Sequence, residues 1–266
     1  MKLSKDSERL TFGEHLEVFR RMLFRILGVS GMIAIVVFCF KNTTWELLLA
    51  PSEWSFSTYR WLEAIMQAMG IGFRFEAFNV QLIATDLSSQ FMTHITTAVY
   101  LGLLGASPYI LYELFRFISP ALYENERRYS VQVAGTIYVL FLLGVLMSYF
   151  VLFPISFRFL GTYSVSAKVV SNITLDSYIS TFVSLTLAMG VVFQLPVIAF
   201  FLGKMGVVTS SMLANYRKHS FIVIMVVAAI ITPPDLMTLI LVTIPLYLLY
   251  EVSIRVVGWV ESRKVK

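Results

Sequence analysis

Four ionisable side chains stand close together in a loop that precedes a long apolar run. Glu124 and Glu126 follow a turn at Pro120 and come directly before Arg127 and Arg128. A carboxylate binds a guanidinium group through paired, charge-assisted hydrogen bonds, so this loop carries groups suited to holding a cation. The simpler interpretation is helix capping, because acidic residues stabilise the positive end of a helix dipole.

A second group of charges lies near the start of the chain. Glu14 and Glu17 alternate with apolar residues at helical spacing and precede Arg20 and Arg21. This pattern predicts an amphipathic helix with its charged face in water, which leads into the first apolar run. The two carboxylates could therefore bind a cation, or they could simply be the solvated face of an ordinary amphipathic helix.

Two polar residues fall in or beside later apolar runs. Gln194 lies within one run, two residues before Pro196, where a buried amide is typical of a hydrogen bond between helices. Asp235 closes the turn formed by Pro233 and Pro234 between the last two runs. In this turn, which we expect on the outer (periplasmic) side, Asp235 is available to cap a helix or to bind an arginine.

Covalent chemistry finds no support in the sequence. The histidines, His15, His94 and His219, fall at predicted helix ends, and neither a metal-ligand motif nor a nucleophile or phosphate-binding motif is present. The single cysteine, Cys39, permits no intrachain disulfide. We therefore expect no enzyme activity, no metal and no cofactor.

The composition is typical of an integral membrane protein. Hydrophobic residues make up 58% of the 266 positions, charged residues only 14%, and the net charge is +5. The mean hydropathy is +0.77. Because the basic residues are spread over several short loops, the positive charge does not indicate nucleic-acid binding.

The apolar runs predict an all-α polytopic membrane protein with six transmembrane helices in a single domain, residues 1–266. The runs cover residues 22–40, 94–112, 131–153, 178–202, 221–232 and 236–250. The last two runs are shorter than the roughly 20 residues that cross a bilayer. They are separated by a Pro-Pro-Asp turn and predict a short helical hairpin.

The distribution of basic residues predicts the orientation. Most of the 21 lysines and arginines lie at the two ends and in alternate loops. Short loops rich in Lys and Arg stay cytoplasmic, so both termini are expected on the cytoplasmic side. The longest outer loop, residues 41–91, carries apolar residues near helical spacing and predicts an amphipathic helix. Its tryptophans could anchor it at the outer headgroups or serve as packing residues.

Several segments together resemble the TatC family, the receptor subunit of the twin-arginine protein translocase. The matching segments are residues 15–21 (His-Leu-Glu-Val-Phe-Arg-Arg), Ala50-Pro51, residues 83–86, the Ser-Pro-Ala-Leu-Tyr-x-x-Glu-Arg-Arg segment at 119–128, residues 232–235 (Thr-Pro-Pro-Asp) and Ile244-Pro245. They follow the family order over nearly the whole chain.

The resemblance implies a function, a site and partners. The function is recognition of folded precursors through an Arg-Arg pair in their signal peptides, at the cytoplasmic face of the cell inner membrane. The site would include Glu126, with Phe117 and Arg127 beside it. The partners would be single-span proteins of the TatA and TatB type, the lipid bilayer and further copies of the chain, with the proton gradient driving export.

The sequence departs from the family pattern at two positions. Where the family usually has a second glutamate, this chain has Val18, and Glu14 or Glu17 would replace it. Glu14 lies one helical turn before Val18 on nearly the same face. Gln194 stands where the family commonly has Glu, and an amide can hydrogen-bond but cannot carry a charge or relay a proton. The alternative class, a small-molecule secondary transporter, would show charged mid-membrane sites and two related halves, which the sequence lacks.

Overall fold

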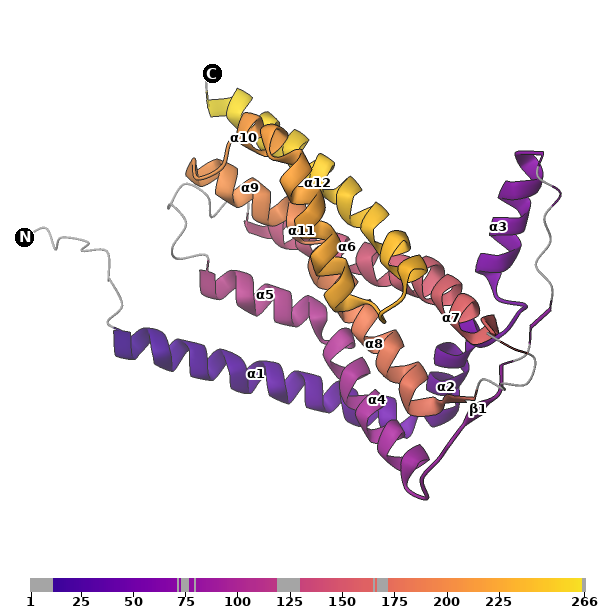
Figure 1. Cartoon of the computed structure of the whole chain (residues 1–266). Coiled ribbons are helices and arrows are strands. Elements are labelled where there is room, and N and C mark those ends of the chain that lie inside the picture. Colours follow the sequence, from indigo (N-terminus) through magenta and orange to yellow (C-terminus); the bar gives the residue numbers. More distant parts are fainter. Residues whose placement is uncertain are drawn as a thin grey trace, which may run out of the picture. The chain divides into compact units, whose positions relative to one another are not determined.

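The fold is all-α, as predicted (Figure 1). The computed structural model describes residues 12–70, 72, 77–78, 80–118, 130–164, 166 and 172–264. Its helices are α1 (Phe12–Cys39), α2 (Lys41–Leu49), α3 (Ser57–Ala68), α4 (Ser89–Gly105), α5 (Ser107–Ile118), α6 (Ser130–Met147), α7 (Phe153–Thr162), α8 (Leu175–Val192), α9 (Leu195–Met205), α10 (Ser210–Asn215), α11 (Arg217–Ile231) and α12 (Leu236–Lys264). Two short strands, β1 (Leu82–Ile83) and β2 (Ile173–Thr174), pair in parallel.

Four helical segments of the described chain are long and apolar enough to cross a membrane: Leu16–Cys39, Gly135–Thr162, Leu175–Met205 and Leu236–Arg263. A fifth arises if α4 and α5, which bend by 52° at Ala106, are taken as one span. Pro108 explains the bend, because it has no N–H to donate back along the helix. The structure thus supports four or five spans, and the predicted count of six is not confirmed.

The predicted hairpin differs from the observed one in its last helix. α11 is short, with 15 residues, but α12 has 29. The prediction of two short helices is therefore wrong for α12. The apolar run ends at Tyr250, but Glu251 bonds Arg217 at 2.7 Å and Glu261 accepts a hydrogen bond from the backbone N–H of Ser210 at 3.1 Å. These contacts stabilise the helix beyond its apolar part.

The chain divides into two compact units. The first unit comprises Met1–Cys39 and Ala98–Tyr138, and the second comprises Phe40–Thr97 and Val139–Lys266. In the first unit, α4 crosses α1 closely at Gly102. A Cβ atom at this position would lie 2.7 Å from the Ser30 carbonyl oxygen and 2.7 Å from the Ala34 Cβ. Only glycine permits this approach.

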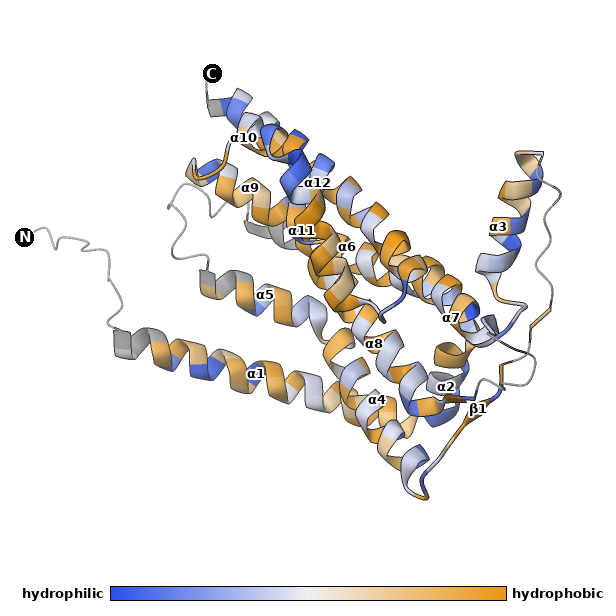
Figure 2. Ribbon diagram, in the orientation of Figure 1, coloured by the Kyte–Doolittle hydropathy of each residue, from blue (hydrophilic) through white to orange (hydrophobic). Residues whose placement is uncertain are grey.

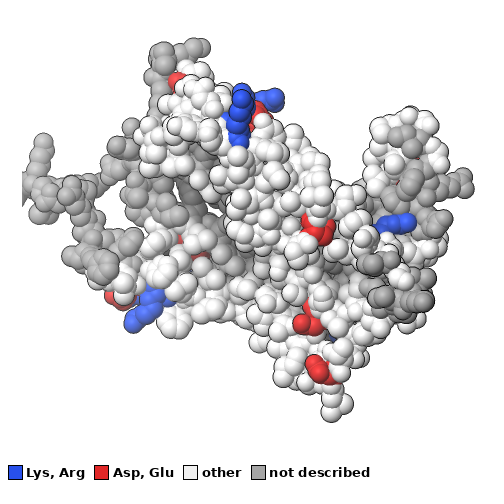
Figure 3. Space-filling model, viewed as in Figure 1, with Lys and Arg blue, Asp and Glu red and all other residues white. Residues whose placement is uncertain are grey.

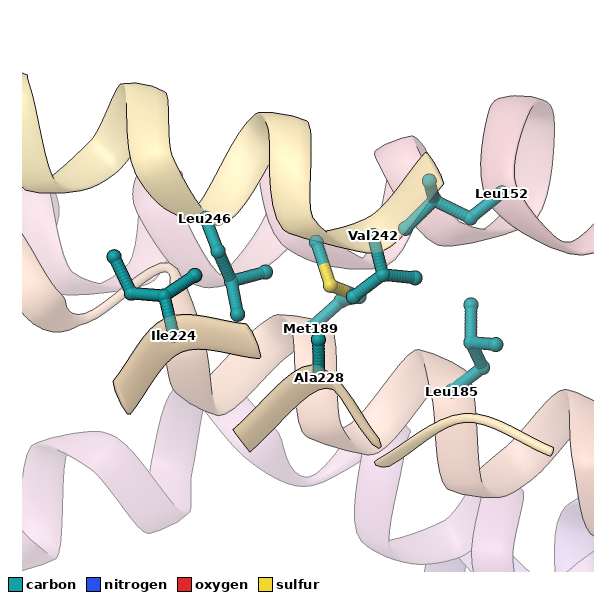
Figure 4. Packing of buried hydrophobic residues seen from close by; sticks show 7 residues of the cluster. All are labelled: Leu152, Leu185, Met189, Ile224, Ala228, Val242 and Leu246. Atoms are coloured by element: carbon teal, nitrogen blue, oxygen red, sulfur yellow. The ribbon is translucent and has the colours of Figure 1, made fainter. Parts of the chain in front are cut away.

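The second unit is built on a hydrophobic core shared by α8, α11, α12 and the π turn Ser148–Leu152 (Figure 4). The residues of this core are Leu152, Leu185, Met189, Ile224, Ala228, Val242 and Leu246. α11 and the first half of α12 are mostly orange in Figure 2, and large apolar side chains such as Ile222, Val226 and Ile244 are exposed on them. Helices that are apolar all round are expected where lipid surrounds them.

Small and polar residues line the crossing of α6 and α8 in the second unit. A Cβ atom on Gly144 would lie 2.5 Å from the Met189 carbonyl oxygen, and one on Gly190 would lie 2.6 Å from the Phe141 ring. One turn further on, the hydroxyls of Ser148 and Thr186 share a buried hydrogen bond of 3.1 Å. The two backbones can therefore approach closely, as in helix pairs packed within membranes.

Candidate functional site

The amino-terminal part of α1 carries both candidate carboxylates of the first group. Glu14 and Glu17 lie in this helix, with Val18 exposed beside them. Glu17 accepts a hydrogen bond from Arg21 one turn later, and both side chains are exposed. An exposed pair of this kind contributes little to stability, so Glu17 can exchange its partner for another cation at small cost.

Phe117, the aromatic residue indicated by the family pattern, lies at the end of α5 and contacts α1. Its ring centroid is 5.6 Å from that of Phe19. The contact brings the end of α5 beside the turn of α1 that holds Glu17. Glu126 and Arg127, which follow in the next loop, lie outside the described residues.

A buried carboxylate that the sequence analysis missed joins the same two helices. Glu113 in α5 is only 5% exposed. One of its oxygens accepts a hydrogen bond of 2.9 Å from the Tyr109 hydroxyl and one of 3.3 Å from the Arg25 guanidinium in α1. The partners are 88 residues apart in sequence. A signal was available in the sequence. Arg25 is the one charge inside the first apolar run, and Glu113 directly follows the second apolar run, residues 94–112.

Gln194 lies at a break in the span Leu175–Met205, between α8 and α9. In a regular helix its backbone N–H would bond the Gly190 carbonyl, but here it bonds Val191 at 3.0 Å. The side-chain Nε2 of Gln194 donates to the Gly190 carbonyl instead, at 3.4 Å. The break follows from Pro196. This contact of the amide lies within its own span.

Asp235 caps α12. Its Oδ1 accepts a hydrogen bond of 2.7 Å from the backbone N–H of Thr238, as expected for an aspartate at a helix start. The capping interpretation of Asp235 is therefore confirmed, and arginine binding remains a prediction. In the described part of the chain, no group of three or more His, Cys, Asp or Glu side chains is placed to hold a metal ion.

Charged side chains of the second unit gather toward its ends. In the face shown by Figure 3, basic atoms with acidic atoms beside them lie over the end of the unit where α10 and α12 meet, and acidic atoms and one basic group near α3 lie toward the opposite end. Between them the surface carries almost no charge, as expected for helices that cross lipid. The long apolar helices and these charged ends define an integral membrane protein.

Comparison with known proteins identifies the family. The family described as "Sec-independent protein translocase protein (TatC)" matches residues 14–245. The chain belongs to this family and is therefore a component of a protein translocase. It is 32% identical over 266 residues to TatC of Blattabacterium sp. subsp. Periplaneta americana, covering 98% of this chain and 100% of that protein. It is 38% identical over 179 residues to TatCy of Bacillus subtilis, covering 67% of this chain and 70% of that one.

A solved structure agrees with this assignment. The crystal structure described as twin arginine translocase receptor TatC superimposes with a TM-score of 0.72 at 31% identity, covering 93% of this chain and 100% of that chain. The same receptor in the detergent DDM gives a TM-score of 0.72 at 32% identity. The resemblance inferred from the sequence motifs is thus confirmed.

Proposed function

We propose that this chain is the receptor subunit of a twin-arginine translocase, which binds the paired arginines of signal peptides on folded precursors. The observation that carries the proposal is the contact between α1 and α5. It joins the helix that holds Glu14 and Glu17 to the helix that leads into the loop with Glu126. We expect Glu126 to lie beside Glu14 or Glu17, and two neighbouring carboxylates can accept two adjacent guanidinium groups.

The site is proposed to face the cytoplasm. Basic residues are concentrated in the two ends and in alternate loops, and the basic side chains at this end of the second unit belong to α11 and α12. By the positive-inside rule, both termini are then expected on the cytoplasmic side of the cell inner membrane. Single-span partners of the TatA and TatB type would assemble with this chain and pass the cargo, using the proton gradient.

The pair formed by Arg25 and Glu113 supports the receptor in a positioning role. Glu113 is too buried to meet a signal peptide directly, but its bonds to Arg25 and Tyr109 fix α5 against α1. Arg25 lies about two helical turns after the exposed Glu17 in α1. An arginine of the signal peptide would therefore meet carboxylates whose separation is set before binding, which lowers the entropy lost on binding.

Crosslinking of a twin-arginine signal peptide to the purified full chain tests the proposal. Glu126→Lys places a cation against the arginines of the peptide and is expected to abolish crosslinking. The matched control is Glu124→Lys, which makes the same charge change two residues away. If these glutamates only cap the helix, both variants would lose about 1 kcal/mol of stability and both would still crosslink.

The carboxylate that replaces the family glutamate is tested in the same assay. Glu14→Ala and Glu17→Ala are compared singly and together, and the double variant is expected to lose crosslinking. Wild-type crosslinking by both Glu126→Lys and the double alanine variant would show that the receptor site lies elsewhere.

A further inference from the structure

The amphipathic helix α3 stands away from the helices that pack against its base. In Figure 1 its axis runs across that of α7, and its far end has no neighbour among the labelled helices. Along one face, Trp61 is 62% exposed and Ile65 is 56% exposed, and Met69, which directly follows the helix, is 64% exposed. The other face carries Arg60, Glu63 and Gln67. An exposed apolar stripe of this kind marks an interaction surface.

Hydrogen bonds fix the base of α3 to the second unit. The Tyr59 hydroxyl donates to the Pro154 carbonyl at 2.9 Å, and the Thr58 hydroxyl donates to the Phe150 carbonyl. Burial raises the pKa of the Tyr59 hydroxyl, and Arg158 lowers it by a smaller amount. The phenol therefore keeps its proton and remains a donor. The orientation of the stripe is thus set by buried contacts.

The base of α3 lies level with the end of the uncharged part of two spans. Pro154, whose carbonyl accepts the Tyr59 hydrogen bond, lies four residues before Arg158, the first charged residue after the apolar run at 131–153. Tyr178 begins the uncharged run at 178–202, and its hydroxyl donates to the Leu48 carbonyl at 2.7 Å. Both contacts place residues 48–61 at the depth where hydrocarbon gives way to headgroups.

The apolar stripe is continuous with the surface of a span. The Trp61 ring lies 6.2 Å from that of Phe150, between their centroids, and Phe56 stacks on Phe150 at 5.8 Å. Trp and Tyr are enriched at the boundary between hydrocarbon and water. We propose that α3 lies in the membrane interface and inserts Trp61, Ile65 and Met69 into the lipid surface.

Insertion of this stripe is driven by apolar burial and not by charge. The described polar face of α3 has one cation and one anion, Arg60 and Glu63, so it offers no net attraction to anionic headgroups. Binding should therefore occur on a zwitterionic bilayer and should not weaken in high salt. This separates α3 from a polybasic surface helix.

Spin labels on the full chain in phosphatidylcholine nanodiscs test the proposal. A background with Cys39→Ser removes the exposed native cysteine. Ile65→Cys carries a label on the apolar face, and Gln67→Cys carries the matched control label on the polar face. Both positions are exposed in the structure. Collision with oxygen, which partitions into lipid, is compared with collision with a water-soluble nickel chelate.

The expected result is opposite preferences for the two labels. The label at residue 65 should collide mainly with oxygen, the label at residue 67 mainly with the nickel chelate, and added salt should change neither. Equal access of the nickel chelate to both labels would overturn the proposal. So would protection of residue 65 from both reagents with dipolar broadening that disappears on dilution with unlabelled chain, because that result assigns the stripe to a second copy.

Discussion

In the first unit, α1 meets α5 through a ring contact and a buried carboxylate, whereas in the second unit α8, α11 and α12 pack around an apolar core. The two units therefore meet different structural requirements. A polar contact fixes the spacing of α1 and α5 next to exposed, exchangeable charges. Close apolar packing fixes the helices that lipid surrounds, where an unpaired polar group is costly.

The largest effect is expected from unpairing the buried carboxylate of the first unit. Arg25→Leu leaves Glu113 without its cation and should destabilise the chain toward the lower end of about 3–5 kcal/mol, since the Arg25 side chain is itself 49% exposed. Reversible unfolding in detergent micelles measures the loss.

The double variant Arg25→Leu/Glu113→Leu is the control for the polar contact. Replacing both members of a buried ion pair by apolar residues is often neutral, so most of the stability should return. A double variant that is no more stable than Arg25→Leu would mean that the pair does not fix the two helices.

A smaller effect is expected from overpacking the second unit. Gly144→Ala forces a Cβ atom against the Met189 backbone, 2.5 Å away, and should cost about 2 kcal/mol in the same unfolding measurement. The matched control in the same helix is Gly135→Ala, since nothing lies within 4 Å of a Cβ atom there. Equal stability of the two variants would show that the close crossing of α6 and α8 is not required.

The smallest effect is expected at the break between α8 and α9. Gln194→Leu removes the donor to the Gly190 carbonyl and should cost about 1 kcal/mol, with reduced export of a twin-arginine precursor. Gln194→Glu should be tolerated, because a protonated carboxyl can donate the same bond. Full export by Gln194→Leu at a normal protein level would exclude Gln194 from the functional residues.

The proposed receptor site could be predicted only in part from the sequence. The motif around Glu126 and the Phe117 position are local patterns, and the match over residues 14–245 confirms the family they indicated. The bond of Gln194 could not be predicted, because it depends on which carbonyl loses its helical partner at the break before Pro196. The pair of Arg25 and Glu113 was missed for a similar reason, since neither residue is unusual until its partner is known.

The sequence by itself determined the class of protein, the helical fold and the amphipathic character of α3. Each depends on composition or on the periodicity of neighbouring residues, because lipid selects apolar segments and backbone hydrogen bonds within a helix are local. Tertiary structure alone decided how far α12 continues past Tyr250, which carboxylate joins α1 to α5 and which carbonyls hold the base of α3. These features depend on contacts such as the one between Arg25 and Glu113, 88 residues apart, which only the folded chain brings together.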